Sequence, residues 1–99
     1  MNKKLYEDLE KQLEQADWGM LKEHHKREAL YVVDDESLDL VKVAVAIAED
    51  DVTFVKDVLG NKKLRKPTDD ETEQWDKEPN VKMANFLIVQ PYVLIKKLH

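Results

Sequence analysis

Two acidic segments carry the side chains most able to do chemistry in this sequence. Carboxylate oxygens are the ligands that Mg²⁺ and Ca²⁺ prefer, so acids brought together by folding could bind such a cation or act in a small enzyme. The candidate ligands are Asp34, Asp39, Glu49, Asp50 and Asp51. They stand in two groups at opposite ends of a predicted helix, and the EF-hand spacing is absent. We therefore expect these acids to cap helices and turns.

A second candidate metal site involves His24 and Glu28, which stand four residues apart. On a helix they would face the same way, as in some zinc sites. Two ligands do not make a site, and a third, such as His99, would have to come from elsewhere in the chain. Histidines in the last turn of a helix also interact favourably with its dipole. We therefore expect a solvated helix end, with no bound metal and no cofactor.

The composition excludes most enzyme classes that leave a sequence motif. The chain has no cysteine, which removes thiol nucleophiles, iron–sulfur clusters and thiolate zinc sites. Ser37 is the only serine and precedes an apolar helical run, so we interpret it as a helix N-cap. With Gly19 and Gly60 as its only glycines, the chain has no glycine-rich phosphate loop.

The lack of cysteine also favours a cytoplasmic location. The N-terminus turns acidic where a signal peptide would need apolar residues. The most apolar runs, residues 43–48 and 86–95, are too short to span a bilayer. We therefore expect no membrane association.

The charge pattern argues against nucleic acid as a partner. The formal net charge is −5 at pH 7, and this charge repels phosphate backbones. The basic cluster, defined as Lys62, Lys63, Arg65 and Lys66, is the exception. We interpret it as an edge strand that its lysines protect from aggregation. Contact with phosphate or an acidic partner is the alternative.

In the first third of the chain, periodicity predicts two helices and a strand. Leu5, Leu9 and Leu13 form a narrow apolar stripe on an N-terminal helix, over residues 1–16, that we expect to be peripheral. Asp17 is the predicted N-cap of a second helix. Residues 29–33 are continuously apolar and rich in β-branched side chains, which predicts a buried strand.

The segment from Ser37 to Gly60 is either one long helix or two. In the second case Asp50 or Asp51 caps the second helix. The charged side of the first helix would be formed by Asp39, Lys42, Ala46 and Glu49. Because its other sides are apolar, residues such as Val43, Ala44 and Ile47 should be among the most buried. Apolar residues share one face of the second helix, namely Val52, Val55 and Leu59.

The last third of the chain combines a short helix with the strongest strand signal. Gly60-Asn61 is a natural left-handed helix stop. The T-x-x-E pattern from Thr68 to Glu71 is a capping box that opens a short helix. Residues 86–95 alternate little and are rich in β-branched residues. Pro91 interrupts this run, so the strand must be bulged, broken or at an edge there.

Three segments resemble one known family. They are ALYVVD at residues 29–34, the helix pattern LDLV-x-VA-x-A-x-AEDD at residues 38–51 and VQPYVLI at residues 89–95. This combination is similar to a family of small bacterial proteins known only as a domain of unknown function. The family has no assigned activity, so the resemblance implies no catalytic or binding residue.

These observations predict one small α+β domain over residues 1–99, with four or five helices around a small sheet that pairs residues 29–33 with residues 86–95. The element order also allows a winged-helix arrangement, although its recognition helix, residues 51–59, would be too acidic for DNA. The expected function is a non-catalytic interaction or oligomerisation module that contacts a protein partner or a second copy through Phe86 to Ile95. A small enzyme or cation-binding protein that uses the acids is the alternative.

Overall fold

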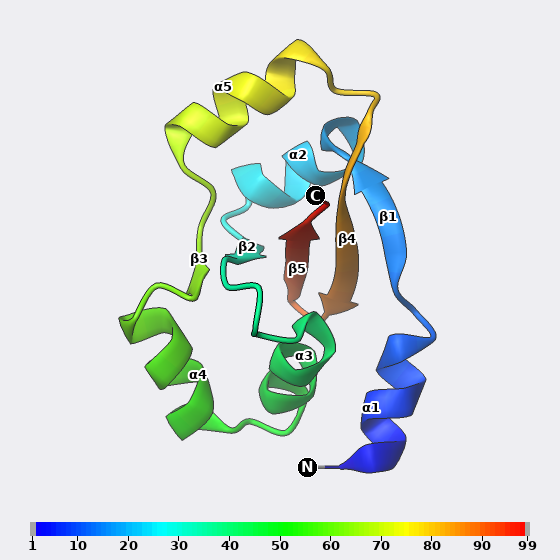
Figure 1. Ribbon diagram of the computed structural model, residues 1–99, viewed down its shortest axis with the longest axis vertical. Coiled ribbons are helices and arrows are strands. Elements are labelled where there is room, and N and C mark those ends of the chain that lie inside the picture. The colour runs from blue at the N-terminus through cyan, green and yellow to red at the C-terminus, as the bar shows by residue number, and fades with distance from the viewer. Residues whose placement is uncertain (1, 99) are drawn as a thin grey trace.

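A five-stranded mixed sheet organises the computed structural model of the protein, which describes residues 2–98 (Figure 1). The strand order is β1-β4-β5-β2-β3. The central strand β5 pairs parallel with β2, and the other neighbours pair antiparallel. The strands are β1 (Glu14–Asp17), β2 (Leu30–Val33), β3 (Leu64–Arg65), β4 (Lys82–Val89) and β5 (Tyr92–Lys97).

Five helices in the described residues cover both faces of this sheet. The helices are α1 (Lys3–Glu10), α2 (Trp18–Lys26), α3 (Leu40–Ala48), α4 (Val52–Gly60) and α5 (Asp69–Lys77). Side chains of α1, α3 and α4 share one hydrophobic core with one face of the sheet, and those of α2 and α5 share a second core with the other. In β5, Leu94 faces the first core, whereas Val93 and Ile95 face the second, as the alternation of a strand requires.

The structure confirms the predicted α+β class and the pairing of the two predicted strand regions. Leu30 to Val32 lie beside Val93 to Ile95 in the parallel register. The run of residues 86–95 is broken at Gln90-Pro91, a cis peptide in the turn that joins β4 to β5. Because a central five-stranded sheet separates two helical layers, the winged-helix alternative does not describe the domain.

Three predicted helix starts are confirmed by side-chain hydrogen bonds, and one is wrong. Asp17 caps α2, Asp51 caps α4, and Thr68 with Glu71 forms the capping box of α5. The N-cap of α3 is Asp39, whose side chain accepts from the Val41 amide, and not Ser37. Ser37 lies two residues before this N-cap, in the preceding turn, where its hydroxyl donates to the Asp35 carboxylate instead.

The N-terminal helix is shorter than predicted, and a strand follows it. Helix α1 ends at Glu10, and residues 14–17 pair with β4. The pairing buries Ala16 completely although the EQAD sequence has little strand character. At the end of α4 the left-handed residue is Lys62, with φ 63°, rather than Gly60 or Asn61, because the helix continues through Gly60.

Helix α3 is the buried centre of the first core, with two exceptions to the predicted orientation. Ala46, which was predicted on the charged side of the helix, is buried. Val43 and Ala44 are fully buried, and Lys42 and Glu49 are exposed, as predicted. Ile47 is only partly buried because it borders a cleft between α3 and α4. No helix within residues 2–98 has the length and apolar character needed to cross a membrane.

Candidate functional site

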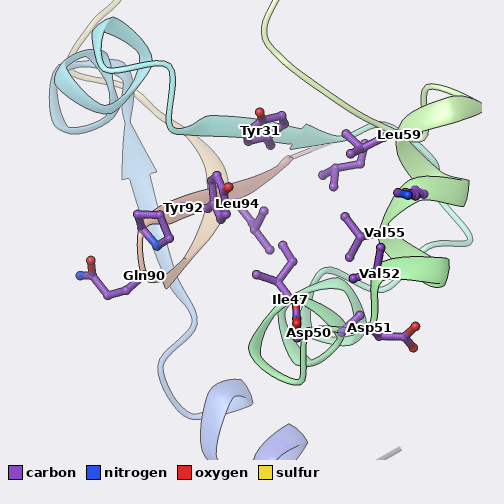
Figure 2. Close-up of a pocket in the computed structure, with 14 residues that line it drawn as sticks. Tyr31, Ile47, Asp50, Asp51, Val52, Val55, Leu59, Gln90, Tyr92 and Leu94 are labelled. Atoms are coloured by element: carbon purple, nitrogen blue, oxygen red, sulfur yellow. The ribbon is translucent and has the colours of Figure 1, made fainter.

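An apolar cleft of about 360 Å³ opens between α4 and the sheet (Figure 2). One wall is formed by Val52, Val55 and Leu59, which project from α4 toward the strands. The opposite wall comes from β2, β5 and the β4–β5 turn. The residues that line this wall are Tyr31, Gln90, Pro91, Tyr92 and Leu94. Ile47 at the end of α3 closes the cleft on a third side.

The cleft exists because α3 ends abruptly and α4 leaves in a new direction. Asp50 takes the left-handed conformation, with φ 56°. The Asp50 amide donates to the Ile47 carbonyl at 3.1 Å, and the Asp51 amide donates to the Ala46 carbonyl at 2.8 Å. This is the hydrogen-bond pattern of a Schellman motif. It rules out one long helix and directs α4 so that Val58 is its only buried residue.

The apolar face of α4 is therefore left partly open. Val52 is 48% exposed and Leu59 is 42% exposed. These are high values for aliphatic side chains that face a concave surface rather than open solvent. On the opposite wall, the rings of Tyr31 and Tyr92 meet edge to face, with centroids 5.7 Å apart. Such a pair holds each ring in a defined orientation.

The charged groups of the cleft are Asp50, Asp51 and Lys56. Asp51 accepts from the Phe54 amide at 3.2 Å and is thereby held as the cap of α4. Within residues 2–98, neither Asp50 nor Lys56 has a side-chain hydrogen bond or an ion pair. Because the cleft's ionisable side chains are not hydrogen-bonded to one another, it contains no assembled acid–base or nucleophile–base pair in the described part of the chain. Its walls are suited to contact with apolar groups.

The predicted carboxylate ligands are not brought together. Asp34 forms an ion pair with Arg65 at 2.9 Å, and Asp39 caps α3 while it accepts from the Tyr6 hydroxyl. Glu49 is the C-cap residue of α3, at the other end of the helix from Asp39. Among residues 2–98 no three acidic or histidine side chains are grouped as metal ligands.

His24 and Glu28 also fail to share a helix face. Helix α2 ends at Lys26, and Glu28 lies beyond it in the left-handed conformation with φ 59°. The Glu28 carboxylate is 3.4 Å from the Lys66 ammonium. His24 lies in the last turn of α2. The third ligand considered, His99, lies outside the described residues.

Most of the basic cluster is neutralised by acids of the same chain. Lys63 pairs with Asp35 at 3.4 Å, and Lys66 pairs with Glu28. Arg65 lies on the edge strand β3, where its guanidinium contacts Asp34 and forms two hydrogen bonds to Glu71, of 2.7 and 3.1 Å. The predicted edge strand is therefore present, and its bases tie it to neighbouring elements.

Glu71 is the centre of the network that attaches α5 to the sheet. Besides Arg65, Lys97 of β5 donates to its carboxylate at 2.8 Å, and the Thr68 amide donates at 2.9 Å. Burial alone would raise the pKa of Glu71, but the hydrogen bonds from Arg65 and Lys97 lower it to about 2. The network is structural, since it lies on the α5 side of the sheet, away from the cleft residues.

The sheet, its two helical layers and the cleft define a small α+β domain with an open apolar cleft. Residues 4–97 match a family model described as "Protein of unknown function (DUF2288)", and the chain belongs to this family. It is similar to a solved structure, the NMR solution structure of PA1075 from Pseudomonas aeruginosa. The identity is 30%, the TM-score is 0.76, and the match covers 100% of this chain and 89% of the other. No curated protein matches the chain significantly.

The three segments by which the sequence resembles the family all reach the cleft. The strand segment contributes Tyr31, the helix pattern contributes Asp50 and Asp51, and the last segment contributes Gln90 to Tyr92. The sequence placed Val52, Val55 and Leu59 on one helix face but gave no indication that this face stays open. That detail depends on the direction in which α4 leaves α3.

Proposed function

We propose that this protein is a non-catalytic, cytoplasmic interaction module whose cleft receives a helix of a protein partner. The observation that carries the proposal is the exposure of Val52, Leu59 and Tyr92 around one concave surface. Apolar side chains that stay partly exposed around a concave surface are typical of binding pockets. The volume of about 360 Å³ lies at the small end of the usual range for binding pockets. It has room for a few anchoring side chains.

The composition of the walls favours a helix over an extended segment. Added β-strands bind through the free backbone groups of a sheet edge. The edges of this sheet are β1 and β3, and of these only Leu64 lines the cleft. Because the walls consist of side chains, a partner must bind by inserting its own side chains. The apolar face of a helix presents such anchors at three- and four-residue spacing.

The predicted contact segment, Phe86 to Ile95, contributes to this surface through Gln90, Pro91, Tyr92 and Leu94. The remaining wall, from α4, extends the surface beyond that segment. The enzyme alternative has less support, because the acids on which it depends are separated by α3 or occupied as caps.

A peptide-display selection tests the proposal. A library of amphipathic helical peptides is selected on the wild-type protein and depleted on the double variant Val52→Asp/Leu59→Lys. The new charges lie at the two ends of α4, where each interacts favourably with the helix dipole, so the fold should be retained. Val81→Asp is the matched control, since Val81 is 55% exposed and lies outside the cleft.

We expect selected peptides to bind the wild type and Val81→Asp equally and to bind the double variant at least about tenfold more weakly. Amide chemical-shift changes should centre on Tyr31, Val55 and Tyr92. Equal binding to all three proteins, or the absence of any enriched peptide, would contradict the proposal. A wild-type dimer that the double variant converts to a monomer would show that a second copy occupies the cleft instead.

A further inference from the structure

We infer that the helix received by the cleft carries a lysine or arginine next to its apolar anchors. This inference rests on the proposed function and specifies the chemistry of the partner. It depends on the combination of apolar walls with uncompensated negative charge at one end of the cleft. Figure 2 shows Asp50 at that end, beside Ile47, whereas the Asp51 side chain, which caps α4, points away from the cleft.

The charge at this end of the cleft is not neutralised within the described chain. Every ion pair among residues 2–98 joins residues outside the range 37–62. Asp34, Asp35 and Glu71 all have basic partners, whereas Glu49, Asp50 and Asp51 at the junction of α3 and α4 have none. Lys56 is the only base among the described residues that line the cleft. Three acids without a basic partner in the described chain thus stand together at the junction of α3 and α4, at one end of the cleft, and a basic group of the partner complements them.

The walls also suit the aliphatic part of a basic side chain. Lysine and arginine lay their methylene groups along apolar surface while the charged end reaches a polar partner. Tyr92 is 38% exposed and lines the same cleft, and aromatic rings attract cations. The lining thus offers apolar, aromatic and carboxylate groups to a basic side chain. An acidic side chain in that place would meet Asp50 at a cost in free energy.

Asparagine substitutions test the charge without disturbing the backbone. Asparagine tolerates the left-handed conformation required at position 50 and is as good an N-cap as aspartate at position 51. The double variant Asp50→Asn/Asp51→Asn should therefore keep the wild-type stability. Asp57→Asn is the matched control, because Asp57 is an exposed carboxylate on α4 that does not line the cleft. Lys56→Gln tests the sign, since it removes the base that competes with the partner.

The probes are the peptides enriched in the selection above, together with copies in which each lysine or arginine is replaced by glutamine. Titration calorimetry at low and physiological salt should show that Asp50→Asn/Asp51→Asn weakens binding about three- to tenfold. Asp57→Asn should change the Kd less than about twofold, and Lys56→Gln should tighten binding. The glutamine peptides should bind wild type more weakly and lose the salt dependence.

The two proposals fail differently. If peptides bind the cleft but carry no excess of lysine and arginine, and Asp50→Asn/Asp51→Asn leaves the Kd unchanged, the inference is wrong and the interaction function stands. If acidic peptides are enriched and Lys56→Gln weakens binding, the inference is also wrong, because the partner helix then carries a negative charge. If no peptide distinguishes the wild type from Val52→Asp/Leu59→Lys, both proposals are wrong.

Discussion

Replacement of Glu71 by glutamine isolates the charge that attaches α5 to the sheet. Glutamine has nearly the same shape and can still complete the capping box with Thr68. The variant therefore removes the negative charge that faces Arg65 and Lys97 while the local geometry is kept. The side chain of Glu71 is only 14% exposed, so water does not replace the lost partner fully.

The expected loss of unfolding free energy follows from the shifted pKa of Glu71. Burial opposes ionisation of Glu71, but Arg65 and Lys97 outweigh it and lower the pKa from 4.5 to about 2. A difference of this size between the folded and unfolded chain corresponds to about 3 kcal/mol. Lys97 is 43% exposed, and solvent weakens exposed pairs. We therefore expect Glu71→Gln to lower the free energy of unfolding by about 2 kcal/mol at neutral pH.

The effect should depend on pH in a defined direction. Because the folded pKa is lower than the unfolded one, the contribution of Glu71 is complete above about pH 5 and is lost as the pH falls toward 2. Urea unfolding at pH 7 and pH 3 should show the difference between the wild type and the variant shrink by more than half. Glu73→Gln is the control, since Glu73 is exposed on the same helix and forms no ion pair with residues 2–98. A difference that is equal at both pH values, or below about 0.5 kcal/mol at pH 7, would refute the reasoning.

Three further predictions concern the core, the basic cluster and a strained turn. Leu94→Ala should lower the free energy of unfolding by about 2–5 kcal/mol, because Leu94 is fully buried, and Ile47→Ala by less than about 2 kcal/mol, because Ile47 borders the cleft. Equal losses for the two variants in urea titrations would contradict this. Labelled duplex DNA should show no binding by fluorescence anisotropy at physiological salt, since acids of the chain pair with Lys63, Arg65 and Lys66; micromolar, salt-sensitive binding would refute it. Lys62→Gly should raise the free energy of unfolding by about 0.5–1 kcal/mol because Lys62 has φ 63°, whereas Asn61→Gly, at φ −95°, should not; a loss of stability for Lys62→Gly would count against the strain.

Sequence patterns that involve only a few neighbouring residues predicted helix starts and a strand break well. The caps at Asp17 and Asp51 and the Thr68 capping box are local hydrogen-bonding patterns, and the structure confirms them. The break at Pro91 follows equally from the missing amide hydrogen of proline. The prediction of Ser37 as the N-cap of α3 was wrong, because the Asp39 carboxylate stands directly before the helix and accepts from the Val41 amide.

Features that depend on distant residues could not be predicted. The residues of β1 have little strand propensity, and their conformation comes from pairing with β4, some 70 residues later in the chain. The cleft was not predicted; the sequence indicated only a contact segment, Phe86 to Ile95, part of which lines the cleft. Its other wall depends on the angle between α3 and α4, which no pattern of apolar residues specifies.

The position of β5 in the middle of the sheet has a consequence for the order of events during synthesis. β5 lies between β4 and β2, and it joins residues near position 30 to residues near position 93. Until residues 92–97 have been synthesised, β2 and β4 lack β5, the strand that pairs with both, and neither hydrophobic core has the central strand against which its helices pack. Helices α2, α3 and α4 can form transiently by then, but their apolar faces remain without a sheet to cover. We therefore expect cooperative folding of this domain to begin only after β5 has left the ribosome, with apolar surface exposed on the nascent chain until then.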